Sequence, residues 1–191
     1  MRYGPEHKAV IHKKIVKDAA RRVRAEGITG AAVTAVMRDA GLTHGGFYKH
    51  FGSKDELLME SLGEAFRETA DRLAQVAETA RPGEEWKAIV TAYLSPKHCE
   101  HAEWGCPLAS LAPELARAEK GMKGQIGEEL EKYKGRMLPY MPGRRAADKE
   151  RAFFVIFSTM IGTVAIARML QDEGARARVL AGSRDFLLGS F

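Results

Sequence analysis

The sequence VTAVMRDAGLTHGGFYKHFGSKDEL, residues 33–57, contains the pattern that decides the fold. Apolar residues at helical spacing predict a first short helix that ends at Gly41, a residue able to adopt the positive φ of a tight turn. Thr43 is placed to cap a second helix, which we predict over residues 44–51. Two short helices joined by a glycine turn form a helix-turn-helix, an arrangement that binds DNA.

The second of these helices has two contrasting faces. Phe47 and Phe51 are four residues apart, so we expect both in the core. Two adjacent glycines cost about 1 kcal/mol each relative to alanine, and a bare backbone offsets this cost where it must approach a large ligand. The other face carries the candidate groove-contacting residues His44, Gly45, Gly46, Tyr48, Lys49 and His50. Of these, Lys49 is the candidate donor to guanine, and a packed or capping role remains the alternative for His50.

Basic charge is concentrated in the same part of the chain. The net charge is +5 over 191 residues, but residues 1–54 contain 11 Lys/Arg and four Asp/Glu, whereas the remainder contains 19 and 21. A basic module of this kind neutralises DNA phosphates. A solvated helix face is the plainer explanation of the same charges, and the charge count does not decide between the two.

Several classes of protein are excluded by what the sequence lacks. It contains no P-loop, no dinucleotide-binding fingerprint, no His-Glu-x-x-His and no Cys-x-x-Cys motif. We therefore expect no enzyme activity, no cofactor and no bound metal. Two cysteines argue against a disulfide framework, and the charged N-terminus does not resemble a signal peptide. These features predict a cytoplasmic protein.

The rest of the pattern predicts an all-α protein. A helix is expected from His7 or Lys8 to Glu26, with Gly27 as its stop. A long amphipathic helix follows the Ser53–Glu56 capping box. Proline and glycine separate the later helices, which we expect at residues 84–94, from Pro107 with a kink or restart at Pro113, at 122–137, at 148–172 and at 175–188.

The most apolar segment is residues 152–167. Sixteen residues that include hydroxyl side chains are too few and too polar for a membrane span, so we expect no membrane partner. A helix that is apolar on nearly all sides is buried on several sides, one against its own domain and one against a partner chain. Gly162 would permit close approach of a second helix.

The stretch LTHGGFYKHFGSKDEL, residues 42–57, resembles the signature of the TetR family of bacterial transcriptional regulators. That signature runs apolar–Ser/Thr–x–Gly–x–apolar–Tyr–x–x–Phe–x–Ser–Lys–x–x–Leu. Nine positions match: Leu42, Thr43, Gly45, Phe47, Tyr48, Phe51, Ser53, Lys54 and Leu57. The first helix of the pair departs from the family, because Ala31 and Ala32 stand where a capping Ser or Thr is usual, and Met37 replaces a small residue.

The resemblance implies a fold, a division into domains and a dimer. It implies a three-helix DNA-binding domain over residues 1–53 and a helical ligand-binding and dimerisation domain over residues 54–191. The last two helices, about 149–189, would form a four-helix bundle between two copies. The resemblance implies that Tyr48 and Lys54 contact phosphates of an operator in double-stranded DNA. Thr43 can both cap its helix and form a hydrogen bond with a phosphate.

The resemblance also implies a small-molecule inducer that releases a repressor from a palindromic operator. We expect the inducer to be partly apolar and to bind between the helices of the second domain. The candidate pocket residues are Phe66, Trp86, Tyr93, Trp104, Cys106, Leu108, Met122, Ile126 and Phe157. For any single one of them, an ordinary core position is the simpler explanation.

The position of Cys106 suggests an alternative function, that of a thiol sensor. It lies just before a predicted helix, where the helix dipole lowers the pKa of a thiol. The motif Gly105-Cys106-Pro107 resembles one in a TetR subgroup, some members of which respond to electrophiles or oxidants. A thiol-sensing repressor therefore competes with a ligand-responsive one. A buried, inert cysteine and a His/Cys metal site are further alternatives for this segment.

A non-specific architectural DNA binder is the remaining rival. It would account for the basic N-terminus but would give no role to the large apolar C-terminal part. The sequence does not identify the inducer, the operator or the regulated genes, and it does not separate repressor from activator.

Overall fold

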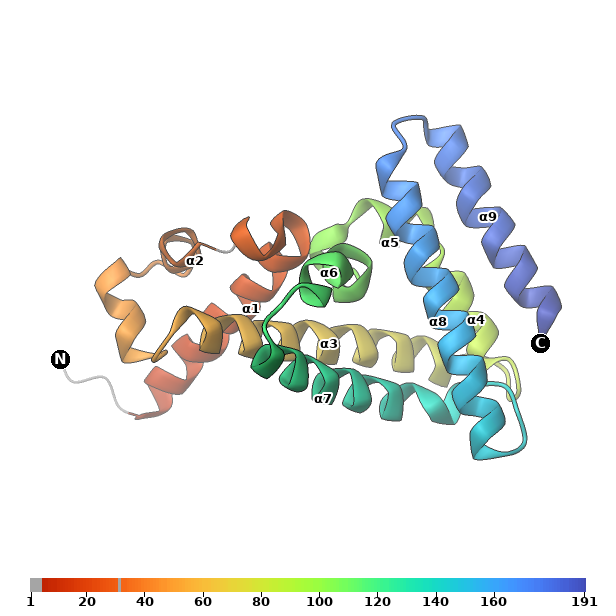
Figure 1. The fold of residues 1–191 in the computed structure, drawn as a ribbon, viewed down its shortest axis with the longest axis horizontal. Helices are drawn as coiled ribbons and strands as arrows, with labels where there is room; N and C mark the ends of the chain where they lie inside the picture. Colours follow the sequence, from red (N-terminus) through yellow and green to blue (C-terminus); the bar gives the residue numbers. More distant parts are fainter. Residues whose placement is uncertain (1–4, 31) are drawn as a thin grey trace.

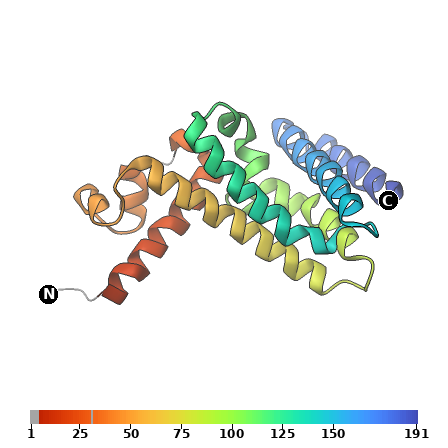
Figure 2. The ribbon, with the colours of Figure 1, turned by 60° about the horizontal axis from the view of Figure 1, so that its bottom comes forward.

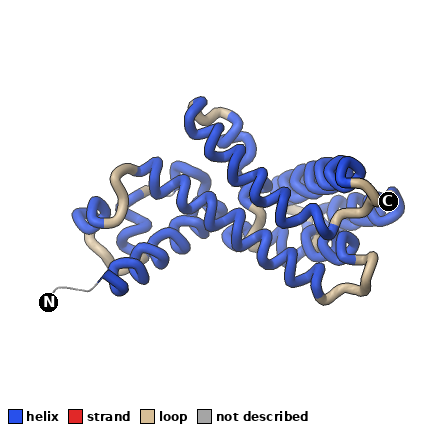
Figure 3. Tube along the Cα trace, turned by 90° about the horizontal axis from the view of Figure 1, so that it is seen from below, coloured by secondary structure: helices blue, strands red, loops and turns tan. Residues whose placement is uncertain are grey.

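The computed structural model describes residues 5–30 and 32–191, which contain helices and no strand (Figure 3). This confirms the predicted all-α class. The elements are α1 (Pro5–Gly30), α2 (Val33–Asp39), η1 (His44–Lys49), α3 (Lys54–Glu78), α4 (Glu85–Tyr93), α5 (Pro96–Glu100), η2 (Ala102–Trp104), α6 (Pro107–Ala116), α7 (Lys120–Met137), η3 (Leu138–Tyr140), α8 (Ala146–Met169) and α9 (Glu173–Ser190), where η denotes a 3-10 helix.

The protein is elongated, with its helix-turn-helix and its C-terminal helices at opposite ends (Figure 1). Helix α2 lies at the end near the N-terminus, whereas α8 and α9 lie at the end that carries the C-terminus. Helix α3 runs between the two ends with α7 alongside it (Figure 2). A movement of α3 would therefore change the positions of helices at both ends of the molecule.

Two hydrophobic clusters stabilise these ends. The N-terminal cluster joins α1, α2, η1 and the first half of α3, and it also includes Leu111 and Leu115 of α6. The C-terminal cluster joins the second half of α3 to α4, α7, α8 and α9. Helices α3 and α6 contribute to both clusters, so packing is continuous across the predicted domain boundary at residue 53. That boundary stays a prediction.

Several helices differ in detail from the sequence prediction, and α5 forms where no helix was predicted. Helix α1 already begins at Pro5, and Gly27 breaks it with a φ of 79°, as expected of a glycine stop. The second helix of the motif is a 3-10 helix over His44–Lys49, so the predicted α-helix to residue 51 was wrong. Helix α6 continues through Pro113 without a restart.

Buried polar contacts hold α1 against the rest of the molecule. The Arg24 side chain is fully buried and donates to Glu68 Oε2 of α3 at 2.7 Å and to the Ala65 carbonyl at 3.4 Å. At the C-terminal end of α1, the Ile28 amide donates to Glu114 Oε2 of α6 at 3.0 Å. Both contacts join residues more than 40 positions apart.

Helix α8 is apolar on two sides, as predicted. One side is buried in the C-terminal cluster through residues such as Ile156, Met160 and Val164. The other side leaves Phe154, Val155, Ile166 and Met169 exposed. By length and composition alone α8 would suffice for a membrane span, with a mean hydropathy of 1.8, so the expectation that it is too short and too polar was wrong. Its buried face is that of a core helix.

Candidate nucleic-acid interface and internal cavities

The turn between α2 and η1 has the geometry that the glycine predicts. Gly41 has a φ of 77°. Its amide donates to the Arg38 carbonyl at 2.9 Å, and the Leu42 amide donates to the Met37 carbonyl at 2.8 Å. This pair of bonds is a Schellman motif, which ends the helix and satisfies its last carbonyl groups. Leu42 then packs on the N-terminal cluster as an apolar plug.

The start of each helix in the motif lacks a side-chain cap. Ala32 occupies the N-cap of α2, and no side chain among the described residues caps it, which confirms the predicted departure. Ala31 lies outside the described residues. Thr43 occupies the N-cap of η1, but its hydroxyl makes no capping bond within the described chain, so the predicted cap was wrong. The Thr43 carbonyl accepts from the Gly46 amide at 3.0 Å instead.

Phe47 and Phe51 anchor η1 and turn its other residues outward. Each ring is 2% exposed, and their centroids are 5.4 Å apart, which confirms that both are core residues. The Tyr48 ring packs edge-on against Phe47 but is 71% exposed. The predicted groove-contacting residues that the structure leaves exposed are Thr43, His44, Gly45, Tyr48, Lys49 and Lys54, with Gly46 partly buried.

The structure leaves His50 half-buried, with one ring nitrogen turned into the protein. Its ring centroid is 6.0 Å from that of His12 and 6.3 Å from that of Phe51. Its Nδ1 is buried and has no hydrogen-bond partner among the described residues. Burial lowers the pKa of His50, and positive charge on His12 lowers it further. These contacts favour the packing role that the sequence left open for His50.

Helix α3 begins beside η1 and presents Lys54. Ser53 Oγ accepts from the Glu56 amide at 3.0 Å, and Glu56 Oε2 accepts from the Gly52 amide at 2.6 Å. The predicted capping residues are thus in place, although Glu56 reaches the amide one residue before the cap. Lys54 is exposed at this helix start, where free amide groups already favour an anion.

An ion pair sets the position of α2 on α1. Arg22 Nε donates to Asp39 Oδ2 at 2.6 Å, and the Arg22 guanidinium also contacts Glu26. This hydrogen bond holds the pKa of Asp39 below its usual value. Arg22 is neutralised in this way and is not available to phosphate. Lys13 and Lys14 of α1 remain exposed, and Lys14 Nζ donates to the carbonyl of Ala40, next to the turn of the motif, at 3.2 Å.

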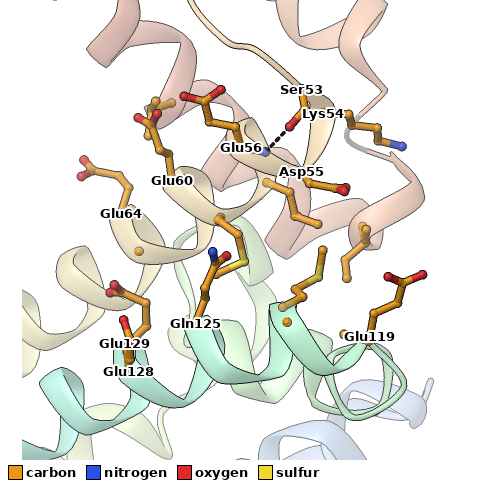
Figure 4. Close-up of a pocket in the computed structure, with 18 of the residues that line it drawn as sticks. Ser53, Lys54, Asp55, Glu56, Glu60, Glu64, Glu119, Gln125, Glu128 and Glu129 are labelled. Carbon is orange, nitrogen blue, oxygen red and sulfur yellow. Dashed lines mark hydrogen bonds between the residues drawn. The ribbon is translucent and has the colours of Figure 1, made fainter.

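A large acidic groove of about 1260 Å³ lies between α1, α3 and α7. Carboxylates from α3, such as Glu60 and Glu64, face Glu128 and Glu129 of α7 across it (Figure 4). Eight of its lining residues are Asp or Glu, and four are His, Lys or Arg. The excess of carboxylates disfavours phosphate along most of the groove, and Lys54 lies among its basic lining residues.

A second cavity, of about 520 Å³, has the opposite charge; we call it the basic cavity. Helices α3 and α4, the α5 region and η2 surround it. Its lining residues are Thr69, Arg72, Leu73, Val76, Ala92, Tyr93, Ser95, Lys97, His98, His101 and Trp104. Four of them are Arg, Lys or His, and none is Asp or Glu. Sequence reasoning missed Arg72 and Lys97, and it considered His98 and His101 only for a His/Cys metal site, because only the tertiary structure brings α3 beside α5.

The structure separates the nine predicted pocket residues. Only Tyr93 and Trp104 line the basic cavity. Met122 lines the acidic groove, and Phe66 lines a smaller cavity of about 420 Å³ beside α7. The others pack in or against the hydrophobic clusters: Trp86, Cys106, Leu108, Ile126 and Phe157.

The two cysteines are free and buried. Cys106 has no exposed surface and is the N-cap of α6. Burial raises the pKa of its thiol, and this effect exceeds the opposing hydrogen bonds from Tyr93 and from the first amides of α6. The prediction of a thiol pKa lowered by the helix was therefore wrong. Burial also raises the pKa of Cys99.

His98 fixes the segment around Cys106. Its Nδ1 lies 2.7 Å from the Tyr93 carbonyl, and its Nε2 accepts from the Cys106 amide at 3.1 Å. Burial lowers the pKa of His98 to about 4, so the ring is neutral and both nitrogens are occupied. Among the described residues, no group of three or more His, Cys, Asp or Glu side chains is placed to hold a metal ion.

We predict that neither thiol reacts with the aromatic disulfide reagent DTNB in the folded protein. A buried thiol with a raised pKa supplies little thiolate and is not accessible. Both cysteines should react once the protein is unfolded in urea, which serves as the internal control. Reaction of one thiol equivalent under native conditions, lost in Cys106→Ser, would restore the thiol-sensing alternative.

Residues 15–60 match the profile of the family described as "Bacterial regulatory proteins, tetR family". No curated protein sequence matches the chain. Among solved structures, the chain is similar to a TetR transcriptional regulator from Chloroflexus aurantiacus J-10-FL, with 21% identity, a TM-score of 0.77 and coverage of 96% of this chain and 95% of that chain.

Two other solved structures have the same fold over nearly their whole length. A TetR-family regulator from Cytophaga hutchinsonii has 16% identity and a TM-score of 0.76, with 98% of each chain covered. The transcriptional regulator FadR from Bacillus subtilis, solved in complex with stearoyl-CoA, has 17% identity and a TM-score of 0.66, with 94% of this chain and 98% of that chain covered.

Proposed function

Because the chain belongs, through residues 15–60, to the TetR family of bacterial regulatory proteins, we propose that it is a homodimeric transcriptional repressor. A small molecule releases it from a palindromic operator in the cytoplasm. The observation that carries the proposal is η1: two buried phenylalanines hold this short helix so that its polar and cationic residues stand outside the protein.

The exposed residues divide into two roles on DNA. Tyr48 and Lys54 contact phosphates, because Tyr48 is exposed on η1 and Lys54 is exposed at the start of α3. Thr43 adds a phosphate contact, since its hydroxyl is not used as a cap. The bases are contacted by His44, Gly45, Gly46 and Lys49, of which Lys49 donates to guanine. The two glycines let the backbone approach the base edges.

The outer faces of α8 and α9 form the dimer interface in this proposal. Phe154, Ile166 and Met169 are exposed on α8, and Phe186 is 68% exposed on α9. Small residues lie among them, and a Cβ added at Gly162, Gly182 or Gly189 would meet no atom of the described chain within 4 Å. Apolar side chains between small residues suit the close packing of a helical bundle.

Selection of bound genomic fragments tests the proposal. A repressor should enrich a few fragments that contain a two-fold symmetric site, with half-sites about one helical turn apart or a multiple of it. Binding to such a fragment should exceed binding to bulk DNA by at least about a thousandfold at physiological salt. Equal binding to all fragments would instead identify a non-specific architectural protein.

The phosphate contact of Lys54 predicts a change in salt dependence. Replacing Lys54 by alanine should weaken binding to every fragment by a similar factor and reduce the salt slope by about one. Lys120→Ala is the matched control, because Lys120 is an exposed lysine at the start of α7. Fluorescence anisotropy at several salt concentrations measures both slopes. An unchanged salt slope in Lys54→Ala would show that Lys54 does not contact a DNA phosphate.

A further inference from the structure

We propose that the basic cavity binds an organic anion, an apolar molecule that carries a carboxylate or a similar acidic group, and that Trp104 transmits its binding to α1. The regulatory meaning of this site rests on the proposed repressor function. The binding itself does not, and it can be tested without DNA.

Arg72 is the strongest reason to expect an anion. Its side chain is partly buried at the cavity wall, and among the described residues it makes no ion pair within 4.0 Å. It donates to the Trp104 carbonyl and, at 3.3 Å, to Thr69 Oγ1. Burial lowers its pKa, and so does the nearby Arg24, with Glu68 opposing only in part. A desolvated arginine without a carboxylate partner favours a ligand that supplies one.

The other lining groups add positive charge and no negative charge. Lys97 is exposed at the cavity and has no ion pair in the part of the chain that the structure describes. His101 contacts Glu103 at 3.1 Å, while His98 is neutral. Arg72 and Lys97 therefore supply the attraction. The acidic groove, with eight carboxylates along its walls, has the opposite excess of charge and is less favourable for the same ligand.

The remaining walls suit an apolar body. Leu73 and Val76 of α3 lie on one side, and the rings of Tyr93 and Trp104 contribute aromatic surface. A volume of about 520 Å³ is within the range of small-molecule sites in proteins. The cavity thus combines an anion-binding end with apolar and aromatic walls.

Trp104 belongs to both the cavity and the contact with the DNA-binding end. The guanidinium carbon of Arg21 in α1 lies 4.2 Å from the centroid of the Trp104 ring. Arg72 holds the Trp104 carbonyl. An anion that engages Arg72 will therefore disturb η2, and η2 packs directly on α1. This gives a short path from the cavity to the helix that supports α2 and η1.

Paired probes test the binding site. Anilinonaphthalene sulfonate and phenylnaphthylamine share an aromatic skeleton, but only the first is an anion. Fluorescence titration should show that Arg72→Gln weakens binding of the sulfonate by about tenfold or more, with the neutral amine changed less than about twofold. Arg72→Lys should retain most of the affinity. Arg81→Gln, an exposed arginine just after α3, is the matched control and should bind as wild type.

Two results would overturn the anion site. One is unchanged sulfonate affinity in Arg72→Gln. The other is an equal loss for both probes in Arg72→Gln and Arg72→Lys, because this would mean that Arg72 only supports the fold. Decanoate and decanol as competitors give an independent readout: decanoate should displace the sulfonate in wild type, and decanol should compete much less. Equal competition by both would exclude a role for the charge.

Arg21→Gln tests the transmission step on a selected DNA fragment. The variant should bind the sulfonate with wild-type affinity and retain DNA binding, but decanoate should release it from DNA less readily than it releases wild type. Arg117→Gln, an exposed arginine beyond the C-terminal end of α6, is the control. If decanoate released Arg21→Gln from DNA as readily as it releases the wild type, Trp104 would not transmit ligand binding to α1. If no fragment is selected at all, the repressor proposal fails while the probe titrations still stand.

Discussion

Replacing Phe186 by glutamate is expected to give a folded monomer that no longer occupies the operator at concentrations that saturate the wild type. Phe186 is 68% exposed on α9, among glycines that the subunit does not need for its own packing. A carboxylate buried at a two-fold interface would face its own copy across the axis and lose its water. A single DNA-binding domain then keeps one half-site and loses about a hundredfold to ten-thousandfold in apparent affinity.

Ala177→Glu is the matched control for this variant. Ala177 is exposed on α9 nine residues before Phe186, which is two and a half helical turns, so it lies on the opposite flank. Analytical ultracentrifugation measures the dimer dissociation constant, and circular dichroism checks that both variants remain helical. A Phe186→Glu protein that stays dimeric would place the interface elsewhere on the molecule.

The second large effect is expected from Glu68→Gln, which should reduce the free energy of unfolding by about 3 kcal/mol or more. The carboxylate of Glu68 is 14% exposed and accepts from the fully buried Arg24 guanidinium at 2.7 Å. Removal of the carboxylate charge leaves Arg24 buried without compensation. Urea unfolding followed by circular dichroism measures the loss. DNA binding should weaken in parallel, because this ion pair joins α1 to α3.

Two further variants distinguish the loss of the Arg24–Glu68 ion pair from a general effect of substitutions in α3 on stability. Asp71→Asn breaks an exposed pair with Arg67 on the same helix and should cost less than about 1 kcal/mol. The double variant Arg24→Met with Glu68→Leu removes both charges and should recover most of the stability that Glu68→Gln loses. A cost for Glu68→Gln no larger than that for Asp71→Asn would contradict the assigned role of Arg24.

The helix-turn-helix was predictable because its signals are local. Gly41 takes the positive φ that ends α2, Ser53 caps α3, and the spacing of Phe47 and Phe51 places both in the core. Each of these depends on residues within one or two helical turns. The same locality explains the error at η1: the two aromatic residues determine which side is buried, but they are equally compatible with an α-helix or a tighter 3-10 helix.

The cavity was not predictable in the same way. Arg72, Lys97 and Trp104 come from three elements that meet only after the chain has folded. Conversely, residues such as Trp86 and Phe157 have the composition of a pocket wall but lie in the core. Apolar side chains at helical spacing indicate burial, and burial alone does not separate a core position from a cavity wall.

The sequence by itself determined the all-α class, the position of the helix-turn-helix and the burial of Phe47 and Phe51, since short-range spacing, capping and turn chemistry are sufficient for these. Only the tertiary structure decided that His50 is half-buried, that Cys106 is buried with a raised thiol pKa and that Arg24 pairs with Glu68. These features depend on desolvation and on contacts between distant segments, which a linear pattern does not contain. The ligand contacts that we propose therefore lie in the basic cavity, among residues of α3, α4, the α5 region and η2.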